Sequence, residues 1–175
     1  MKYKDAVKNA MDMLALDERV RFIGYNTKYG SRAYKTLRDV PYEKCLETPL
    51  AENLMSGLAI GMSLEGYKPI LLFERHDFIL NALDSIVNHM DKIEIMSNGE
   101  FKVPVIVRAI VGGKKPLDPG IQHTQDYTKA IKEMVSFPII DLKRVEDIIP
   151  SYEKALEMNG PIMIVERRDF YENEY

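Results

Sequence analysis

The stretch Thr48-Pro-Leu-Ala-Glu52, continued by Asn53-Leu-Met-Ser-Gly-Leu-Ala-Ile-Gly-Met-Ser-Leu-Glu65, decides the fold of this chain. Thr48 is a good helix N-cap, and Pro49 suits the first helical position, where its missing N–H costs nothing. The residues that follow are apolar almost all round, which predicts a buried helix. Glu52 then lies in the first turn of that helix. Either it faces water near the positive helix end, or it is a buried carboxylate with a partner or a task.

Strand-like and helix-like segments alternate on both sides of this stretch. Short apolar runs typical of strands occur at residues 20–23, 43–46, 69–73, 103–107, 138–140 and 162–165. Apolar residues at helical spacing occur at residues 3–16, 78–96, 126–135 and 145–158. The alternation predicts a single α/β domain over residues 1–175, a three-layer, doubly wound, mostly parallel sheet of about six strands. Two long loops, residues 25–39 and 108–125, connect these elements, and we expect the first to contain a short helix.

Composition excludes several classes of protein. The chain has 175 residues, a net charge of −3 and scattered basic residues, which argues against a nucleic-acid surface. No run approaches the roughly 18 apolar residues of a membrane span, and the first residues lack a secretory signal, so we expect a cytoplasmic protein. The single cysteine, Cys45, excludes an internal disulfide and is expected to be buried.

Polar side chains follow the predicted strand at residues 69–73. Glu74, Arg75, His76 and Asp77 come directly after its apolar run. In open α/β sheets, ligands bind at the carboxyl ends of the strands. These side chains are therefore candidates for a binding site.

The order of the motifs resembles the pyrimidine-binding domain of thiamine-diphosphate (ThDP) enzymes. The similarity is greatest to the β subunit of 2-oxoacid dehydrogenase E1 components, and transketolase is a more distant relative. The motifs that carry the resemblance are Glu47-Thr-Pro-Leu-Ala-Glu52, Gly57-Leu-Ala-Ile-Gly-Met62, Gly66-Tyr-Lys-Pro-Ile70, Asp77-Phe78, Ala82-Leu-Asp84, Ile86-Val-Asn-His89, Lys92, Met96-Ser97, Gly99, Val103-Pro-Val-Ile-Val-Arg108, Gly112-Gly113 and Gln122-His-Thr-Gln125.

The resemblance implies a catalytic role for Glu52. In the family, the Glu at this position hydrogen-bonds N1′ of the cofactor's aminopyrimidine, which favours the tautomer that removes the C2 proton of the thiazolium. The reaction chemistry then belongs to the cofactor, and the protein supplies a placed acid.

The resemblance also assigns roles to other residues. Phe78 is expected to stack on the pyrimidine, although it is also consistent with a core residue at a helix start. His123 is expected to be catalytic and to face the substrate, unless it caps the next helix. Further cofactor contacts are expected at Leu50, Glu74 and Asn81. His89 matches a family position, but we expect it to be structural.

Two departures from the family pattern concern the substrate. Tyr25-Asn26 stands where the family often has an acidic residue, and Arg75-His76 replaces mainly apolar or aromatic residues. Arg75 and His76 are therefore candidate substrate residues. A guanidinium fits a carboxylate or a phosphate, but Arg75 is equally consistent with an exposed surface residue.

The sequence lacks the Gly-Asp-Gly motif with which the family holds diphosphate and Mg²⁺. It also ends where an E1 β subunit would continue into a C-terminal domain. We therefore expect a pyrimidine half that acts with a diphosphate-binding subunit carrying the Mg²⁺, in an α2β2 heterotetramer. The expected reaction cleaves or forms a C–C bond next to the carbonyl of a small 2-oxoacid or ketose.

Two alternatives remain open. The chain is also compatible with a non-catalytic regulatory or assembly subunit that has a degenerate pyrimidine domain, because fold alone does not define activity. An unrelated nucleotide-binding domain is the third possibility, but no Gly-rich phosphate loop follows the first strand.

Overall fold

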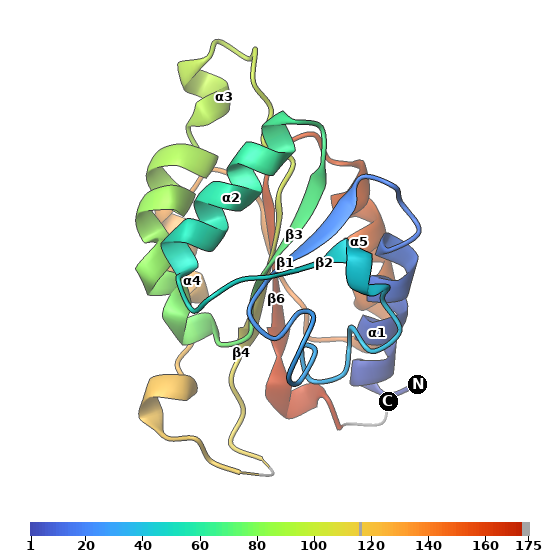
Figure 1. Cartoon of the computed structure of the whole chain (residues 1–175). Coiled ribbons are helices and arrows are strands. Elements are labelled where there is room, and N and C mark those ends of the chain that lie inside the picture. Colours follow the sequence, from blue (N-terminus) through green and yellow to red (C-terminus); the bar gives the residue numbers. More distant parts are fainter. Residues whose placement is uncertain (116, 173–175) are drawn as a thin grey trace.

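The computed structural model describes residues 1–115 and 117–172. Its centre is one parallel sheet with the strand order β2-β1-β3-β4-β6-β5 (Figure 1). The strands are β1 (Val20–Gly24), β2 (Cys45–Glu47), β3 (Lys68–Phe73), β4 (Ile106–Val111), β5 (Ile139–Asp141) and β6 (Ile162–Arg167). β3 and β4 are buried along their whole length, as expected for strands covered on both faces. The predicted doubly wound α/β fold with six strands is confirmed.

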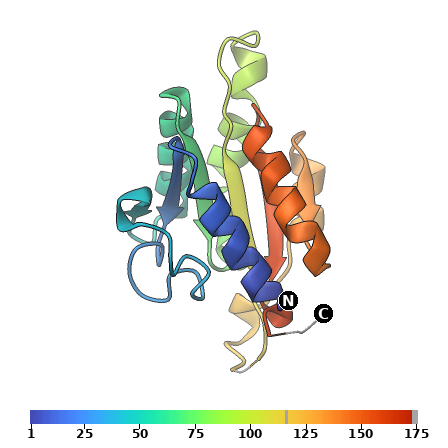
Figure 2. The ribbon, with the colours of Figure 1, turned by 90° about the vertical axis from the view of Figure 1, so that its right-hand side faces the viewer.

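Helices cover both faces of the sheet (Figure 2). α1 (Tyr3–Leu14) and α5 (Ile148–Glu157) pack together on one face, and their apolar residues form one core cluster. The other face carries α2 (Glu52–Leu64), η2 (His76–Ala82), η3 (Asp84–Met90) and α4 (Thr128–Met134), which bury a second cluster. α3 (Ile93–Met96) lies at the end of the sheet at the top of Figure 1. Short 3-10 turns are η1 (Tyr42–Lys44), η4 (Ile121–His123), η5 (Val145–Asp147) and η6 (Arg168–Phe170). No described helix has the length and apolar character needed to cross a membrane.

The expected helix over residues 78–96 is three segments in the structure. η2 is a 3-10 helix, η3 is π-helical, and α3 is a single α-helical turn. The apolar face is nevertheless retained, since Ile79, Ile86 and Met90 are buried. Apolar spacing over a few turns does not distinguish helices with slightly fewer or more residues per turn, so the sequence pattern misses these changes.

The predicted helix start at Thr48 is wrong. The backbone N–H of Thr48 donates to the carbonyl of Gly24, which extends the pairing of β1 with β2 by one residue. The chain is therefore still extended at Thr48, and α2 begins only at Glu52, with Ala51 as its N-cap. The Thr48 hydroxyl is buried and caps nothing among the described residues.

The prediction that α2 is buried all round is also wrong. Its inner face is buried through Met55, Ala59 and Ile60, but Leu54 is 59% exposed and Leu58 is 36% exposed. The outer face is as apolar as the inner one, so the hydrophobicity of the sequence does not reveal that no described residue covers the outer face.

Arg108 lies inside β4, although the second long loop was expected to begin at this residue. The side chain is completely buried and makes a bidentate pair with Glu166 of β6, with Nε–Oε1 at 2.8 Å and Nη2–Oε2 at 2.9 Å. Nη2 also donates to the hydroxyl of Thr36. An ion pair with well-placed hydrogen bonds allows a charge in the core, which a sequence pattern does not show.

The first long loop contains no α-helix, contrary to expectation. Residues 32–35 instead all have positive φ, between 47° and 69°, and form a left-handed turn. Such a turn is strained for L-residues, so hydrogen bonds from other parts of the structure must stabilise the loop. Glu47 does so at the start of the loop, where its carboxylate accepts the backbone N–H groups of residues 26–29. Arg32 does so further on by donating to backbone carbonyls of Thr27, Arg38 and Val40.

Candidate functional site

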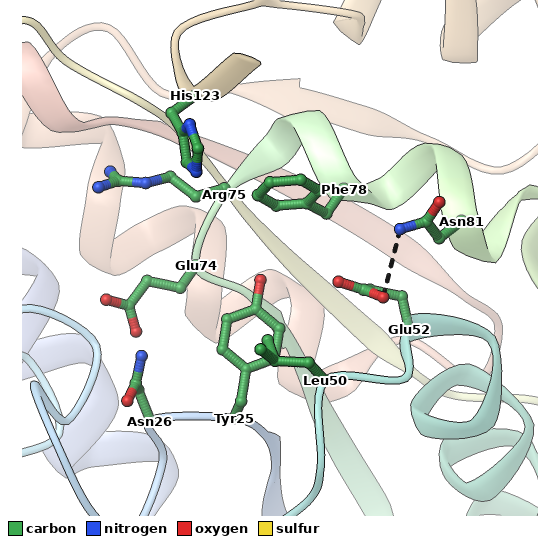
Figure 3. Close-up of a pocket in the computed structure, with 9 residues that line it drawn as sticks. All are labelled: Tyr25, Asn26, Leu50, Glu52, Glu74, Arg75, Phe78, Asn81 and His123. Atoms are coloured by element: carbon green, nitrogen blue, oxygen red, sulfur yellow. Dashed lines mark hydrogen bonds between the residues drawn. The ribbon is translucent and has the colours of Figure 1, made fainter. Parts of the chain in front are cut away.

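A cavity of about 540 Å³ lies at the carboxyl ends of β1 and β3. Side chains from the first loop, the start of α2, η2 and η4 surround it (Figure 3). The nine lining residues are Tyr25, Asn26, Leu50, Glu52, Glu74, Arg75, Phe78, Asn81 and His123. Its position is the one at which parallel α/β sheets bind ligands.

Glu52 is the first residue of α2 and points into the cavity (Figure 3). The residue is only 7% exposed, yet its carboxylate has a single described side-chain partner, the amide of Asn81, with Nδ2–Oε2 at 3.4 Å. The helix N-terminus stabilises a negative charge at this position. Oε1 has no hydrogen-bond partner among the described residues and therefore remains available to a bound molecule.

Phe78 and His123 form the opposite wall. Their rings meet edge to face, with centroids 5.3 Å apart and an interplanar angle of 77°. Phe78 is on η2 and His123 ends η4, so the contact joins two segments that are 45 residues apart. Phe78 supplies an apolar ring surface to the cavity, and His123 supplies an imidazole beside it.

Glu74 lies at the end of the cavity formed by the first loop. Its Oε1 accepts a hydrogen bond from the hydroxyl of Ser31 at 2.8 Å, and the amide of Asn26 is directed toward it (Figure 3). Burial raises the pKa of Glu74, while the hydrogen bonds from Ser31 and Asn26 act in the opposite direction. Burial, with the nearby charge of Glu52, also raises the pKa of Tyr25. The wall therefore favours the neutral forms of both groups.

Several polar atoms around the cavity lack partners. The hydroxyl of Tyr25, Oε2 of Glu74 and Nδ1 of His123 are buried and make no hydrogen bond within the described part of the chain. A buried polar group without a partner costs about 1–3 kcal/mol, so such atoms are rare in folded proteins. Their concentration in one cavity indicates a site completed by a polar ligand.

Arg75 brings a positive charge to the same cavity. Its guanidinium lies 5.4 Å from the ring centroid of Tyr34, and Arg168 lies 5.0 Å from the same ring. Within residues 1–115 and 117–172, no carboxylate forms an ion pair with Arg75. The guanidinium lies over an aromatic face and interacts with the charge of Glu74 without forming an ion pair with it, which leaves its hydrogen-bond donors for another anion.

The structure brings all the predicted site residues to this cavity except His76. The His76 ring is fully buried on the other side of η2, beside Tyr127 and Thr128. His89 is on the surface, where its Nε2 lies 3.6 Å from Oδ2 of Asp84. Cys45 is buried, as expected.

Tyr25 and Asn26 also line the cavity, although neither was predicted as a site residue. They directly follow β1, just as Glu74 and Arg75 directly follow β3. β1 and β3 are neighbouring parallel strands, so side chains after their carboxyl ends must meet. Like Glu74, both residues were identifiable from their position directly after an apolar strand.

An open parallel α/β sheet with a partly unsatisfied polar cavity at its carboxyl edge defines a ligand-binding domain of the doubly wound class. The sequence is matched over residues 1–173 by the family described as transketolase, pyrimidine binding domain. The chain belongs to this family.

Several curated relatives are subunits of one kind of enzyme complex. The pyruvate dehydrogenase E1 component subunit beta of Rickettsia conorii is 27% identical over 177 residues, which cover 98% of this chain and 54% of the relative. The human mitochondrial subunit of the same name is 27% identical over 173 residues, covering 96% and 48%. The chain thus spans about half the length of the curated relatives it matches.

A solved structure of a split-gene transketolase, described as an inactive β4 tetramer, has the same fold. It superposes with a TM-score of 0.73 at 19% identity, over 96% of this chain and 52% of that one. At this identity the similarity concerns the fold.

Proposed function

We propose that this chain is the pyrimidine-binding subunit of a two-subunit ThDP-dependent enzyme. The observation that carries the proposal is the buried carboxylate of Glu52, which opens α2 and keeps Oε1 free toward a cavity with further unsatisfied polar atoms. A family of pyrimidine-binding domains and relatives that are E1 β subunits support this assignment.

The cavity fits an aminopyrimidine ring. Such a ring presents hydrogen-bond donors and acceptors at its edge and a flat surface above and below. Glu52 would bind the ring nitrogen N1′, and Asn81 would keep the carboxylate turned toward it. Phe78 and Leu50 would contact the ring surface. When bound, ThDP supplies the nucleophilic carbon that attacks a substrate carbonyl.

The remaining residues face the space left for a substrate. His123 would exchange a proton with the substrate oxygen, and its unpartnered Nδ1 is buried at the wall. Arg75 would bind an anionic group of a small 2-oxoacid or ketose, whose C–C bond next to the carbonyl is cleaved or formed. Glu74 and Tyr25 complete this end of the cavity, where burial raises the pKa of both groups.

A second subunit is part of the proposal. The outer face of α2 presents Leu54 and Leu58 to solvent, and Leu50 at the rim of the cavity is 74% exposed. An apolar surface continuous with a cavity rim is typical of an interface. We propose that a diphosphate-binding subunit covers it and holds the diphosphate with Mg²⁺, in an α2β2 heterotetramer.

Co-expression with a candidate diphosphate-binding subunit tests the proposal. We expect titration calorimetry with ThDP and Mg²⁺ to show binding by the assembled pair and weak or no binding by the chain alone. Leu54→Asp should prevent assembly, whereas Leu16→Asp, at an 83% exposed position after α1, should not.

Tight cofactor binding by the chain alone would contradict the need for a partner. A pair that assembles and binds ThDP, but turns over no 2-oxoacid or ketose, would favour a regulatory or assembly subunit instead.

A further inference from the structure

Three consecutive residues at the start of η2, His76 to Phe78, contact the segment that carries His123. Phe78 meets the ring of His123, Oδ1 of Asp77 accepts the backbone N–H of Gln125 at 2.8 Å, and Nδ1 of His76 accepts the backbone N–H of Tyr127 at 3.5 Å. The contacts therefore fall on every second residue of the segment 123–127. Such a regular pattern fixes both the position and the direction of this segment.

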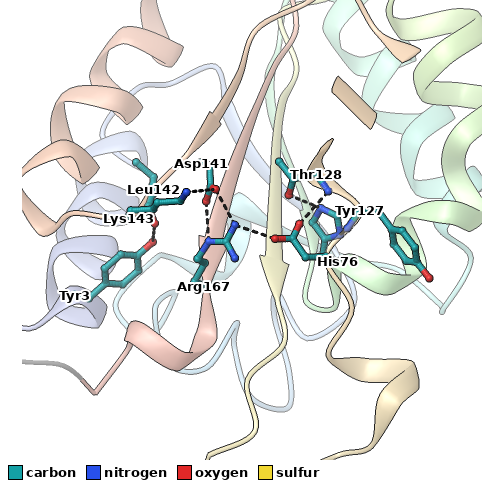
Figure 4. Close-up of polar contacts among 9 residues, drawn as sticks. Tyr3, His76, Tyr127, Thr128, Asp141, Leu142, Lys143 and Arg167 are labelled. Atoms are coloured by element: carbon teal, nitrogen blue, oxygen red, sulfur yellow. Dashed lines mark hydrogen bonds and ion pairs between the residues drawn. The ribbon is translucent and has the colours of Figure 1, made fainter. Parts of the chain in front are cut away.

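The contacts of His76 determine its protonation state. A backbone N–H can only donate, so Nδ1, which accepts from Tyr127, carries no proton. The single proton of the neutral ring is then on Nε2, which lies 3.3 Å from the hydroxyl of Thr128 and donates to it. The ring also stacks on that of Tyr127, with centroids 6.4 Å apart and an interplanar angle of 26° (Figure 4).

The charged groups around His76 come from several elements. Asp126 precedes α4, Asp77 follows His76 on η2, and Arg167 ends β6. Arg167 donates to Asp126 at 2.9 Å and to Asp141 of β5 at 2.7 and 2.8 Å (Figure 4). Burial lowers the pKa of His76, and Arg167 lowers it further, while the three carboxylates oppose this shift and only partly offset it. The neutral form is therefore the one present near neutral pH.

We propose that His76 is a positioning residue, a proton-sensitive latch that together with Asp77 holds the segment 123–127 so that His123 stays against Phe78. Protonation of Nδ1 removes the acceptor for the Tyr127 N–H and places a charge in a fully buried site, so the latch opens. This inference rests on the proposed function, in which His123 exchanges a proton with the substrate, so that the position of His123 affects the rate. It assigns to His76 a role other than the substrate contact expected from the sequence.

Proton titration of the full chain gives the first test, without any substitution. We expect ¹⁵N and ¹³C NMR of labelled histidine to show the neutral Nε2–H tautomer for His76 at pH 7.5. We also expect the Tyr127 amide to lose exchange protection at a pH below about 6.5, the usual pKa of histidine. The Leu142 amide, which donates to Val165 in the sheet, is the internal reference and should stay protected. A protonated ring or the Nδ1–H tautomer at pH 7.5 would overturn the proposal.

Two variants separate the hydrogen bond from the bulk of the ring. His76→Asn keeps an acceptor at the Nδ1 position and does not titrate, so the Tyr127 amide should stay protected across the pH range. His76→Leu keeps bulk but removes the acceptor, so above about pH 6.5 the amide should exchange about five to ten times faster than in the wild type, as expected for one lost hydrogen bond, and acid should cause no further loss of protection. His89→Leu, at an exposed histidine paired with Asp84, is the matched control and should change nothing. Equal protection of the Tyr127 amide in His76→Leu and the wild type at pH 7.5 would overturn the latch.

The pH dependence of the activity of the assembled enzyme tests whether the latch affects catalysis. The acid side of the pH–rate profile should shift to lower pH in His76→Asn and stay unchanged in His89→Leu. An unshifted profile would overturn the functional part of the latch. Amide exchange tests the latch, and activity tests the proposed function. If exchange shows the latch but the chain does not bind ThDP, only the proposed function is refuted. If His76→Leu does not fold, the latch is still tested by the tautomer of His76 in the wild type and by the protection of the Tyr127 amide in His76→Asn.

Discussion

Nδ2 of Asn81 lies 3.4 Å from Oε2 of Glu52, and this contact joins η2 to the first residue of α2 (Figure 3). The amide occupies one carboxylate oxygen and leaves the other directed into the cavity. The two residues come from elements that pack side by side on the same face of the sheet. The orientation of the carboxylate is therefore a property of helix packing.

Glu52→Gln should abolish exchange of the C2 proton of ThDP in the assembled enzyme while leaving assembly intact. The amide is isosteric but is no acid at working pH, and loss of a placed acid or base lowers rates by about 10²–10⁴-fold. Proton exchange followed by NMR measures the effect. Glu65→Gln, at the exposed end of α2, is the matched control. Unchanged exchange in Glu52→Gln would remove this residue from the mechanism.

Gly112→Ala should displace His123. A Cβ at position 112 would lie 1.7 Å from the backbone carbonyl oxygen of His123, so the segment must move. A shift of about 1 Å at a reacting group lowers the rate by about 100-fold, which steady-state kinetics would detect. Gly160→Ala, where a Cβ meets nothing within 4 Å, should leave the rate unchanged. Equal rates for the two variants would argue that His123 has no part in catalysis.

Arg75→Leu should raise KM for an anionic substrate by about tenfold to a hundredfold, because a hydrogen bond to a charged group contributes about 1.5–3 kcal/mol. Arg75→Lys should recover part of this loss by retaining the charge without the planar fork. Arg38→Leu serves as the control, since its exposed side chain pairs only with Asp39 in the described structure. A KM that does not change in Arg75→Leu would make this residue a surface arginine.

Glu166→Gln should lower the free energy of unfolding by about 3–5 kcal/mol, because it leaves the charge of Arg108 buried without its partner. The hydroxyl of Tyr152 donates to Oε1 of Glu166 and that of Tyr171 to Oε2, so the single amide oxygen of Gln keeps an acceptor in place for only one of them, which adds to the loss. Urea unfolding measures the change. Glu146→Gln, in an exposed pair with Arg144, should leave the midpoint unchanged. A loss well under 1 kcal/mol for Glu166→Gln would show that the pair is not closed to water.

Lowering the pH should protonate Glu47 and thereby weaken the hydrogen bonds that hold the first loop. Burial acts to raise the pKa of Glu47, but hydrogen bonds from Lys28, Asn26, Tyr29 and Thr27 outweigh it and lower the pKa below its usual value. A carboxylate with a lowered pKa stabilises the fold above its unfolded-state pKa, near 4.3, and this contribution is lost as the pH falls through the folded-state value. Amide exchange of residues 26–29 should therefore increase below about pH 4. Glu47→Gln should show this increase already at pH 7, whereas Glu18→Gln, at an exposed turn, should not.

The sequence determined the class of fold and much of the site. Alternating apolar runs and helical periods require a parallel sheet covered on both faces, and the carboxyl ends of such strands meet at one edge. That is why Glu74 and Arg75, placed directly after an apolar run, could be expected to face a ligand. Glu52 was identifiable because a carboxylate that opens an apolar helix is unusual and matches a family motif.

Only the tertiary structure decided where individual polar side chains point. His76 and Arg75 are adjacent in sequence, but one ring is buried against α4 and the other side chain lines the cavity. Arg108 is in the core because Glu166, 58 residues away, lies on the next strand. Local propensity and periodicity act over a few residues, whereas the partners that satisfy a buried charge or hold a loop come from distant segments that folding brings together.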